Sequence, residues 1–287
     1  MKLVLGTVQF GNDYGISNKS GKLETFEVKR IIDYARKRKI LTIDTAMSYE
    51  NANEELSNID IKGFSIISKL SSYTNVEKNF VKSKIMSDIK KMLKQFKTDK
   101  LYGLLVHDVK DLASENGKEI YNTLLELKKK NIVQYIGVSI YSPNEYFDLL
   151  KNFDFDIIQA PFNIFDRRII SEGVIESASK LNIKIHVRSI FLQGLLIDRN
   201  LPKKFNPWSN KFNSWFEWLD QNNLSPVEAC LNFVLHQPSI DSVLLGVQSK
   251  SQISEILSFI NKTKFDIPNF EINSSDILIN PSMWNNL

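Results

Sequence analysis

The sequence predicts a closed (β/α)8 barrel, the architecture also called a TIM barrel, folded as a single domain over residues 1–287. Eight strand-like runs alternate with helix-like segments from one end to the other, which suits the length of such a barrel. The strand-like runs are almost continuously apolar, as expected for parallel strands that are covered on both faces. No G-x-G-x-x-G pattern follows the first of them, which argues against a doubly wound dinucleotide-binding sheet.

The strands and helices are expected in alternation along the chain. Strands are predicted at residues 3–7, 41–44, 65–69, 101–107, 133–139, 156–161, 183–188 and 242–245. Helices are predicted at residues 24–39, 50–57, 75–97, 117–130, 166–181 and 250–261, and from residues 142 and 225 onward. The helix at 75–97 is the most regular, because its apolar residues recur every three or four positions. The helices from 142 and 225 begin with Ser142-Pro143 and Ser225-Pro226, a serine cap followed by a proline in the first turn.

Two segments lie outside this repeat, and no linker rich in Gly, Pro or Ser separates them from it. Residues 191–224 form a long loop after the seventh strand, and residues 264–287 form a C-terminal tail. The aromatics of the long loop include Trp208, Trp215, Phe216 and Trp218. A loop of this length is usually functional or packed on itself. These aromatics are therefore expected either to wall a substrate pocket or to pack over the barrel.

The charges do not point to a nucleic acid partner. The chain has 37 basic and 33 acidic residues, a net charge of +4, and the charges are scattered. The densest basic run, residues 128–130, fits the exposed C-terminal end of a helix. The single cysteine, Cys230, cannot form an intrachain disulfide and is expected to be a buried thiol.

The apolar runs do not point to a membrane partner either. None approaches the ~18 residues of a membrane span, and the N-terminal run is too short for a signal peptide. We expect a cytoplasmic protein without a metal site that acts on a small molecule. The sequence leaves the oligomeric state open.

Four side chains able to exchange protons follow consecutive predicted strands. Asp44, Lys69 and His107 close the second, third and fourth strands, and Tyr49 lies in the loop after the second. In a (β/α)8 barrel the reactive residues come from these strand ends. An acid at the end of a buried strand needs a cationic partner, and neighbouring strands lie ~5 Å apart. We therefore predict that the four side chains converge on one substrate oxygen.

The chemistry of this set is that of a general acid. A free tyrosine has a pKa of about 10, and the Lys69 ammonium would lower the pKa of Tyr49 by favouring its phenolate. Asp44 would keep Lys69 charged and oriented, and His107 would hydrogen-bond the same substrate oxygen. An oxygen that gains charge, as a carbonyl oxygen does on receiving hydride, would be served by such an acid.

Each of these residues also has a plain structural interpretation. Taken alone, Asp44 could cap a helix, and Lys69 could lie on the surface. Tyr49 could pack in its loop, and His107 could be a hydrogen-bonded polar residue at the end of a strand. Their joint position after three consecutive strands favours the functional interpretation.

At these residues the sequence resembles the aldo-keto reductase family, and the resemblance covers nearly the whole chain. Asp44-Thr45-Ala46 with Tyr49 matches the family's D-T-A-x-x-Y signature, and Lys69 and His107 fall at the family's lysine and histidine. The resemblance implies reduction of a small aldehyde, ketone or sugar-derived carbonyl by NAD(P)H. It makes Tyr49 the proton donor, Lys69 and Asp44 the pair that tunes it, and His107 the residue that orients the substrate.

The resemblance also implies a cofactor site, with two departures at its nicotinamide end. Ser139 and Gln159 match residues that hold the nicotinamide carboxamide. Ile140 stands where an asparagine is usual, and Arg188 where an aromatic usually stacks on the nicotinamide. A guanidinium plane can also stack on a ring. The implied cofactor-binding residues are Gly6, Thr7, Ser139, Gln159, Arg188, Ser189, Gln193, Gly194, Leu195, Gly246, Ser249, Lys250 and Gln252.

The segment of residues 245–255 resembles the family's last phosphate-binding turn. A lysine and an arginine that bind the adenosine 2′-phosphate in many members are here Gly246 and Gln252. Ser249 and Lys250 could still contact a phosphate at a helix N-terminus. NADP and NAD therefore both remain open as the cofactor.

Two alternative functions remain beside carbonyl reduction. The changes at Ile140 and Arg188 favour a nicotinamide-binding regulatory protein without turnover. Residues 6–11 and 188–194 resemble a bacterial subgroup associated with surface-sugar biosynthesis, which leaves a sugar isomerase, epimerase or dehydratase open.

Overall fold

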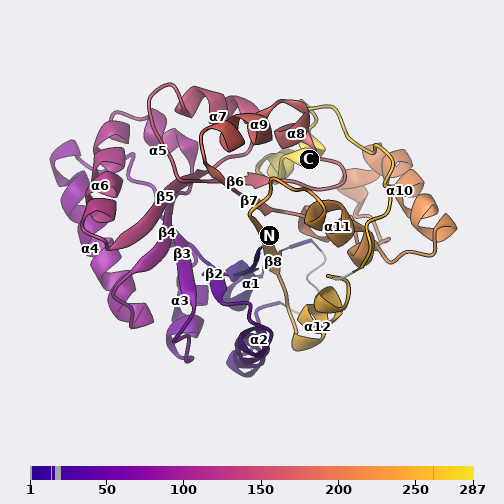
Figure 1. Ribbon diagram of the computed structural model, residues 1–287, viewed down its shortest axis with the longest axis horizontal. Coiled ribbons are helices and arrows are strands. Elements are labelled where there is room, and N and C mark those ends of the chain that lie inside the picture. Colours follow the sequence, from indigo (N-terminus) through magenta and orange to yellow (C-terminus); the bar gives the residue numbers. More distant parts are fainter. Residues whose placement is uncertain (1, 14, 17–20, 261) are drawn as a thin grey trace.

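The computed structural model describes residues 2–13, 15–16, 21–260 and 262–287 of the chain. Eight parallel strands close into a barrel in the order of the sequence, and helices surround it (Figure 1). The predicted (β/α)8 class is therefore confirmed. The strands are β1 (Lys2–Gly6), β2 (Thr42–Asp44), β3 (Ser65–Lys69), β4 (Leu101–Val106), β5 (Val133–Ser139), β6 (Ile157–Pro161), β7 (Lys184–Arg188) and β8 (Ser242–Gly246).

The helices fill most of the connections between strands. The α-helices are α1 (Val8–Gly11), α2 (Thr25–Lys37), α3 (Glu50–Ser57), α4 (Lys78–Phe96), α5 (Val109–Ala113), α6 (Gly117–Lys129), α7 (Pro143–Leu149), α8 (Arg168–Ser171), α9 (Val174–Lys180), α10 (Ser209–Gln221), α11 (Pro226–Leu235) and α12 (Lys250–Ser258). The 3-10 helices are η1 (Leu192–Gly194), η2 (Lys203–Trp208), η3 (Ile277–Ile279) and η4 (Pro281–Asn286).

The core lies mainly between the strands and the surrounding helices. A second, smaller cluster of buried residues lies apart from it and consists of Ile67, Leu105 and Ile157, packed against Tyr102 and Tyr135. Ile67, Leu105 and Ile157 alternate with core residues along β3, β4 and β6, so they point into the barrel. The residue two positions further along β3 and β6 is then at the same inner face, near the strand end.

The strand register brings the predicted site residues to one end of the barrel. Gly6 pairs with Asp44 on β2 and with Gly246 on β8. Ser139 at the end of β5 pairs with Gln159 on β6. All of these pairs are at the C-terminal ends of parallel strands, which is where this fold builds its sites.

The helix predicted at residues 166–181 is wrong as one element. Gly173 adopts a left-handed conformation (φ 78°) and separates α8 from α9. A residue with a side chain is strained in that conformation, so glycine allows the break. The helix predicted from residue 75 begins three residues later, at Lys78, and α1 and α5 are short helices that the pattern did not predict.

Both predicted Ser-Pro helix starts have the serine side chain as a cap, and the one at Ser142 also forms a reciprocal capping box. Ser142 accepts from the Glu145 backbone N–H while the Glu145 carboxylate accepts from the Ser142 backbone N–H, which completes a capping box. Ser225 accepts from the Glu228 backbone N–H at 3.1 Å. Ser142 ends the loop between β5 and α7, and Ser225 ends the loop between α10 and α11.

The long segment after β7 and the C-terminal tail pack against each other. Trp215 on α10 is buried, stacks on Trp218 with ring centroids 5.6 Å apart, and meets the edge of Phe270 from the tail. The Trp208 indole N–H donates to the Asp276 carboxylate at 3.0 Å. The aromatics of this segment therefore pack over the barrel.

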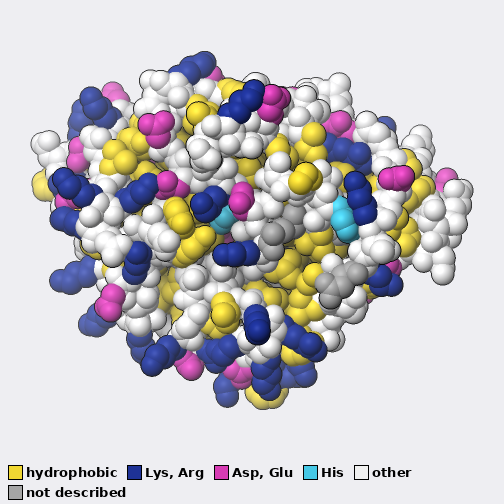
Figure 2. All heavy atoms as spheres, viewed as in Figure 1, with side chains coloured by type: hydrophobic (Ala, Val, Ile, Leu, Met, Phe, Trp, Pro, Cys, Tyr) yellow, Lys and Arg dark blue, Asp and Glu magenta, His cyan; other side chains and the backbone are white. Residues whose placement is uncertain are grey.

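The surface shows Lys and Arg side chains scattered among acidic and uncharged ones (Figure 2). Within the described residues, no helix is long and apolar enough to cross a membrane. The same part of the chain holds no group of three or more His, Cys, Asp or Glu side chains placed to bind a metal ion. Cys230 is fully buried, and burial raises the pKa of its thiol.

Candidate active site

A buried ion pair lies at the centre of the predicted site. The Lys69 ammonium donates to one oxygen of the Asp44 carboxylate, and both residues are 3% exposed. Lys69 also donates to the Thr45 carbonyl at 3.1 Å, and Gln159 donates to the second Asp44 oxygen at 2.8 Å. The Thr7 hydroxyl and backbone N–H both donate to the Asp44 carbonyl. Asp44 is therefore held by groups from β1, β3 and β6, and a buried charge of this kind requires such partners.

Tyr49 and His107 lie beside this pair. Tyr49 directly precedes α3, and its ring centroid is 5.8 Å from the Lys69 ammonium nitrogen. The His107 ring is 5.8 Å from the Tyr49 ring, with the two planes nearly perpendicular at 83°. The Ser48 hydroxyl lies 3.4 Å from Nδ1 of His107. The structure thus brings together the four side chains that the sequence placed at strand ends.

The surroundings shift the protonation of two of these groups. Burial, with the Lys69 and Arg188 charges, lowers the pKa of His107 to about 4. His107 is therefore a neutral imidazole near pH 7, with one ring nitrogen as donor and the other as acceptor. Burial also lowers the pKa of Lys69, and the Asp44 carboxylate opposes this effect.

An open pocket of about 290 Å³ joins this group to the strand ends on the other side of the barrel. Asp44, Tyr49, Lys69 and His107 all line it. So do ten of the residues predicted to bind cofactor: Gly6, Thr7, Ser139, Gln159, Arg188, Ser189, Gln193, Gly194, Gly246 and Gln252. Three predicted residues do not line it. Leu195 is 2% exposed and packs in the core, and Ser249 and Lys250 lie at the start of α12 outside the pocket wall.

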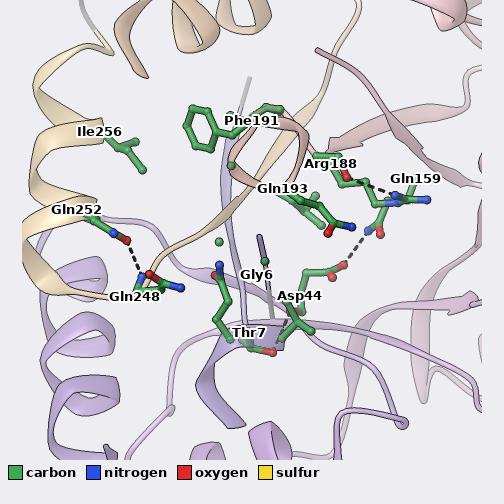
Figure 3. Close-up of a pocket in the computed structure, with 18 of the residues that line it drawn as sticks. Gly6, Thr7, Asp44, Gln159, Arg188, Phe191, Gln193, Gln248, Gln252 and Ile256 are labelled. Carbon is green, nitrogen blue, oxygen red and sulfur yellow. Dashed lines mark hydrogen bonds between the residues drawn. The ribbon is translucent and has the colours of Figure 1, made fainter. Parts of the chain in front are cut away.

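The floor of the pocket offers acceptors that a bound nucleotide could use. Oε1 of Gln159 is buried and has no hydrogen-bond partner in the described part of the chain, while the Gln159 amide N–H is held by Asp44 (Figure 3). Oε1 of Gln9, on α1, is likewise buried without a hydrogen-bond partner in the described part of the chain. A buried acceptor without a partner is costly, and the amide N–H groups of a nicotinamide carboxamide would satisfy it. The residues present therefore fit a nicotinamide ring at this end of the pocket.

Arg188 and Ile140 differ from each other in their relation to the pocket. The Arg188 guanidinium lines it, donates to the Ile140 carbonyl at 3.0 Å, and lies over the Tyr141 ring at 4.3 Å. The Ile140 side chain is fully buried in the core and does not line the pocket. Arg188 is therefore held as a flat, fixed group in the pocket wall.

The loop after β7 forms a sharply turned wall of the pocket. Ser189, Leu192 and Gln193 have positive φ angles of 57°, 47° and 53°, and Gly194 has 101°. A positive φ angle costs free energy for a residue with a side chain, and such residues cluster at sites that bind ligands. The Gln193 carbonyl accepts from the Ile16 backbone N–H at 3.1 Å, so the loop after α1 is tied to the loop after β7.

The pocket includes residues that the sequence did not single out. They are Val8, Gln9, Gly15, Tyr141, Ile190, Phe191, Ile197, Val227, Leu244, Gln248, Glu255 and Ile256. Several lie within three residues of a predicted position, so the rule that sites form at strand ends could have found them. Trp208, Trp215, Phe216 and Trp218 do not line the pocket. Of the two predicted roles for these aromatics, the structure therefore favours packing against the barrel and not forming the substrate pocket.

Comparison with known proteins gives one family and several relatives. The family model described as the aldo/keto reductase family matches residues 2–275. An uncharacterized oxidoreductase, YqkF, of Bacillus subtilis (strain 168) is 25% identical over 193 residues, which are 63% of this chain and 61% of that protein. The chain thus matches less than two thirds of the length of that relative.

Two solved structures share the fold. An aldo-keto reductase from Bacillus halodurans, in its holo form, is 19% identical with a TM-score of 0.73, over 92% of this chain and 88% of that one. A glycerol dehydrogenase from Gluconobacter oxydans is 20% identical with a TM-score of 0.70, over 92% of this chain and 87% of that one. With its barrel, its strand-end residues and a family match over residues 2–275, the chain belongs to the aldo/keto reductase family.

Proposed function

We propose that this protein reduces an aldehyde or ketone to an alcohol with a reduced nicotinamide cofactor, and that Tyr49 supplies the proton. The observation that carries the proposal is the buried Asp44–Lys69 pair beside Tyr49 and His107, at one end of an open pocket. Membership of the aldo/keto reductase family supports carbonyl reduction in general. The substrate class includes small sugar-derived carbonyls, since residues 6–11 and 188–194 resemble a bacterial subgroup associated with surface-sugar biosynthesis.

Tyr49 is the proton donor in this proposal. Its hydroxyl protonates the carbonyl oxygen while that oxygen gains negative charge. The Lys69 ammonium stabilises the phenolate that remains, because an opposite charge nearby favours the ionised form of an acid. The burial that lowers the pKa of Lys69 also makes this lysine a better proton exchange partner for the tyrosine. Asp44 keeps the ammonium in place through its direct contact.

His107 orients the substrate. With a pKa of about 4 it is neutral at working pH, so it donates one hydrogen bond without competing as a strong acid. Its ring lies at right angles to the Tyr49 ring. A carbonyl oxygen between the two rings can accept from both groups.

Gln159, Ser139 and Arg188 would hold the nicotinamide end of the cofactor, and the loop after β7 would cover its middle. The bound dihydronicotinamide would supply a hydride to the carbonyl carbon, which together with the Tyr49 proton gives the alcohol and the oxidised cofactor. The unpartnered Gln159 oxygen and the flat Arg188 group beside it support this placement. Ser249 and Lys250 lie at the start of α12, outside the pocket wall.

The test is cofactor oxidation with a panel of aldehydes, ketones and sugar-derived carbonyls, with the alcohol product identified by chromatography. Tyr49→Phe should lower kcat about 10²- to 10⁴-fold, the usual contribution of a general acid. Tyr135→Phe is the matched control, because Tyr135 packs against Tyr102 near the other end of the barrel interior. It should leave kcat unchanged.

Other results would replace the proposal. Equal rates for wild type and Tyr49→Phe would remove the acid role from Tyr49. Nucleotide binding without turnover of any carbonyl would favour a regulatory protein. Conversion of a sugar without net cofactor oxidation would favour an isomerase, epimerase or dehydratase.

A further inference from the structure

The pocket has two chemically different ends. One end holds Asp44 and Gln159, and the other is formed by α12 with Gln248 and Gln252, which lie across the cavity from them (Figure 3). If the nicotinamide lies beside Tyr49, as the proposed function requires, the adenosine half of the cofactor must extend toward α12. The groups on α12 then decide whether an adenosine 2′-phosphate is accepted.

The α12 end of the pocket wall carries no cation. Among the described residues that line the pocket, the lysines and arginines are Lys69 and Arg188. Lys69 is bound to Asp44, and Arg188 donates to the Ile140 carbonyl, so both are at the nicotinamide end. Phosphate monoesters are recognised by Lys and Arg side chains, most strongly by charged hydrogen bonds. A 2′-phosphate on α12 would meet none of these in the wall.

Three backbone N–H groups at the start of α12, those of Gln248, Lys250 and Gln252, already donate to side chains of the protein. Ser249 Oγ accepts from the Gln252 N–H at 3.1 Å, and the Gln252 side-chain oxygen accepts from the Gln248 N–H at 2.7 Å. The carboxylate of Glu27, on α2, accepts from the Lys250 N–H at 2.7 Å. The helix N-terminus, which could otherwise bind an anion, therefore already has one.

Two cations that lie close in sequence to pocket residues contact other groups. The Lys250 ammonium lies over the Tyr34 ring at 5.5 Å. Arg199, which follows the pocket residue Ile197, makes two hydrogen bonds to the Asp220 carboxylate at 3.1 and 2.5 Å. Neither Lys250 nor Arg199 lines the pocket.

We propose that the pocket takes NAD(H) in preference to NADP(H). The α12 end presents the Gln248 amide and the Glu255 carboxylate, which suit the hydroxyl and amino groups of an adenosine. At the helix start the Glu27 carboxylate already accepts from the Lys250 N–H, and it is also paired with Arg30 at 2.7 Å. Gln248 is the residue that sets the preference, because it is uncharged and lies in the wall at the end where the phosphate would be.

The test is a fluorescence titration of the full-length protein with NADH and with NADPH, which yields two dissociation constants without turnover. Wild type should bind NADH at least about tenfold more tightly, the size expected for one missing charged hydrogen bond. Gln248→Arg should tighten NADPH binding about tenfold or more, and so should lower the ratio of the NADPH to the NADH dissociation constant by about that factor. Ser258→Arg, which adds the same charge at the far, exposed end of α12, should change neither.

The outcomes separate this inference from the proposed function. Equal or tighter binding of NADPH by wild type would overturn the NAD(H) preference and leave carbonyl reduction standing. An unchanged NADPH dissociation constant in Gln248→Arg would show that Gln248 does not set the preference. Failure of both nucleotides to bind would overturn the proposed function itself.

Discussion

At the scale of single residues, the site depends on charges placed where water is excluded. Asp44 and Lys69 are each 3% exposed, and a buried ion pair is stable only when further hydrogen bonds complete it. The Thr45 carbonyl accepts from the Lys69 ammonium, and the Gln159 amide donates to the Asp44 carboxylate. The same burial keeps His107 neutral. The chemistry of the four proposed catalytic residues therefore follows from how the barrel encloses them.

A second buried histidine gives a pH prediction. His186 on β7 is 1% exposed, its Nδ1 has no partner in the described part of the chain, and burial lowers its pKa to about 4. The unfolded chain, with a histidine pKa of about 6.5, binds a proton that the folded protein does not. Stability is therefore lost as the pH falls from about 6.5 to about 4. Between pH 7 and pH 5, the free energy of unfolding of His186→Leu should fall by roughly 2 kcal/mol less than that of wild type.

Urea unfolding at pH 7 and pH 5 measures this difference. The His107 contribution has the same sign and remains in the variant. An equal loss of unfolding free energy in wild type and His186→Leu would show that His186 is not held neutral by burial.

The sequence predicted which residues form the proton-handling set but not how they are bonded. Asp44, Lys69 and His107 each end a strand or follow it directly, so their convergence follows from strand order alone. The Gln159–Asp44 hydrogen bond joins residues 115 positions apart and depends on closure of the barrel. The contacts of Arg188 with Ile140 and Tyr141 likewise depend on tertiary structure, because they join the end of β7 to the residues after β5 across the intervening strand β6.

At the scale of elements, the segment after β7 divides into two parts with different tasks. Its start, with Phe191 and Gln193, forms pocket wall, and α10 packs against the C-terminal tail. A sequence pattern could not separate these tasks, because both parts are rich in large apolar residues. The break at Gly173 was missed for a similar reason, since an isolated glycine is tolerated within many helices.

A substitution on α10 tests this division. The Trp215 indole N–H donates to the Leu196 carbonyl at 3.0 Å. Trp215→Phe should lower the free energy of unfolding by about 1–3 kcal/mol, because that buried carbonyl loses its partner. The KM values for cofactor and carbonyl should not change, since Trp215 does not line the pocket.

Urea unfolding and steady-state kinetics give the two readouts. Trp218→Phe is the control, because the Trp218 indole makes no hydrogen bond within the described part of the chain and contacts only the Trp215 and Phe270 rings there. Trp218→Phe should lower the free energy of unfolding less than Trp215→Phe does. A raised KM in Trp215→Phe would place α10 in the pocket wall after all.

At the scale of the whole molecule, the tail is tied to the barrel at several points. The Ile272 N–H donates to the Phe165 carbonyl at 2.9 Å, and the buried Trp284 meets Phe205 with ring centroids 5.0 Å apart. Phe270 packs against Trp215. These contacts support the prediction that residues 1–287 form a single domain.

That prediction is checked by equilibrium unfolding. The unfolding curves from tryptophan fluorescence and from far-UV circular dichroism should coincide in one transition. Tryptophan fluorescence reports on α10 and the tail, where Trp208, Trp215, Trp218 and Trp284 lie, and circular dichroism reports on the whole barrel. An early fluorescence transition, before the loss of helix, would show that the tail and α10 unfold as a separate unit.

The central claim is that Tyr49 donates the proton to a carbonyl reduced in this pocket, and single-turnover kinetics test it most directly. Protein loaded with reduced nicotinamide cofactor is mixed rapidly with an accepted carbonyl, and the loss of the absorbance of the reduced cofactor is followed. In wild type the cofactor should be oxidised in one fast phase. In Tyr49→Phe, with cofactor binding retained, that phase should slow about 10²- to 10⁴-fold. An equally fast phase in both proteins would contradict the account.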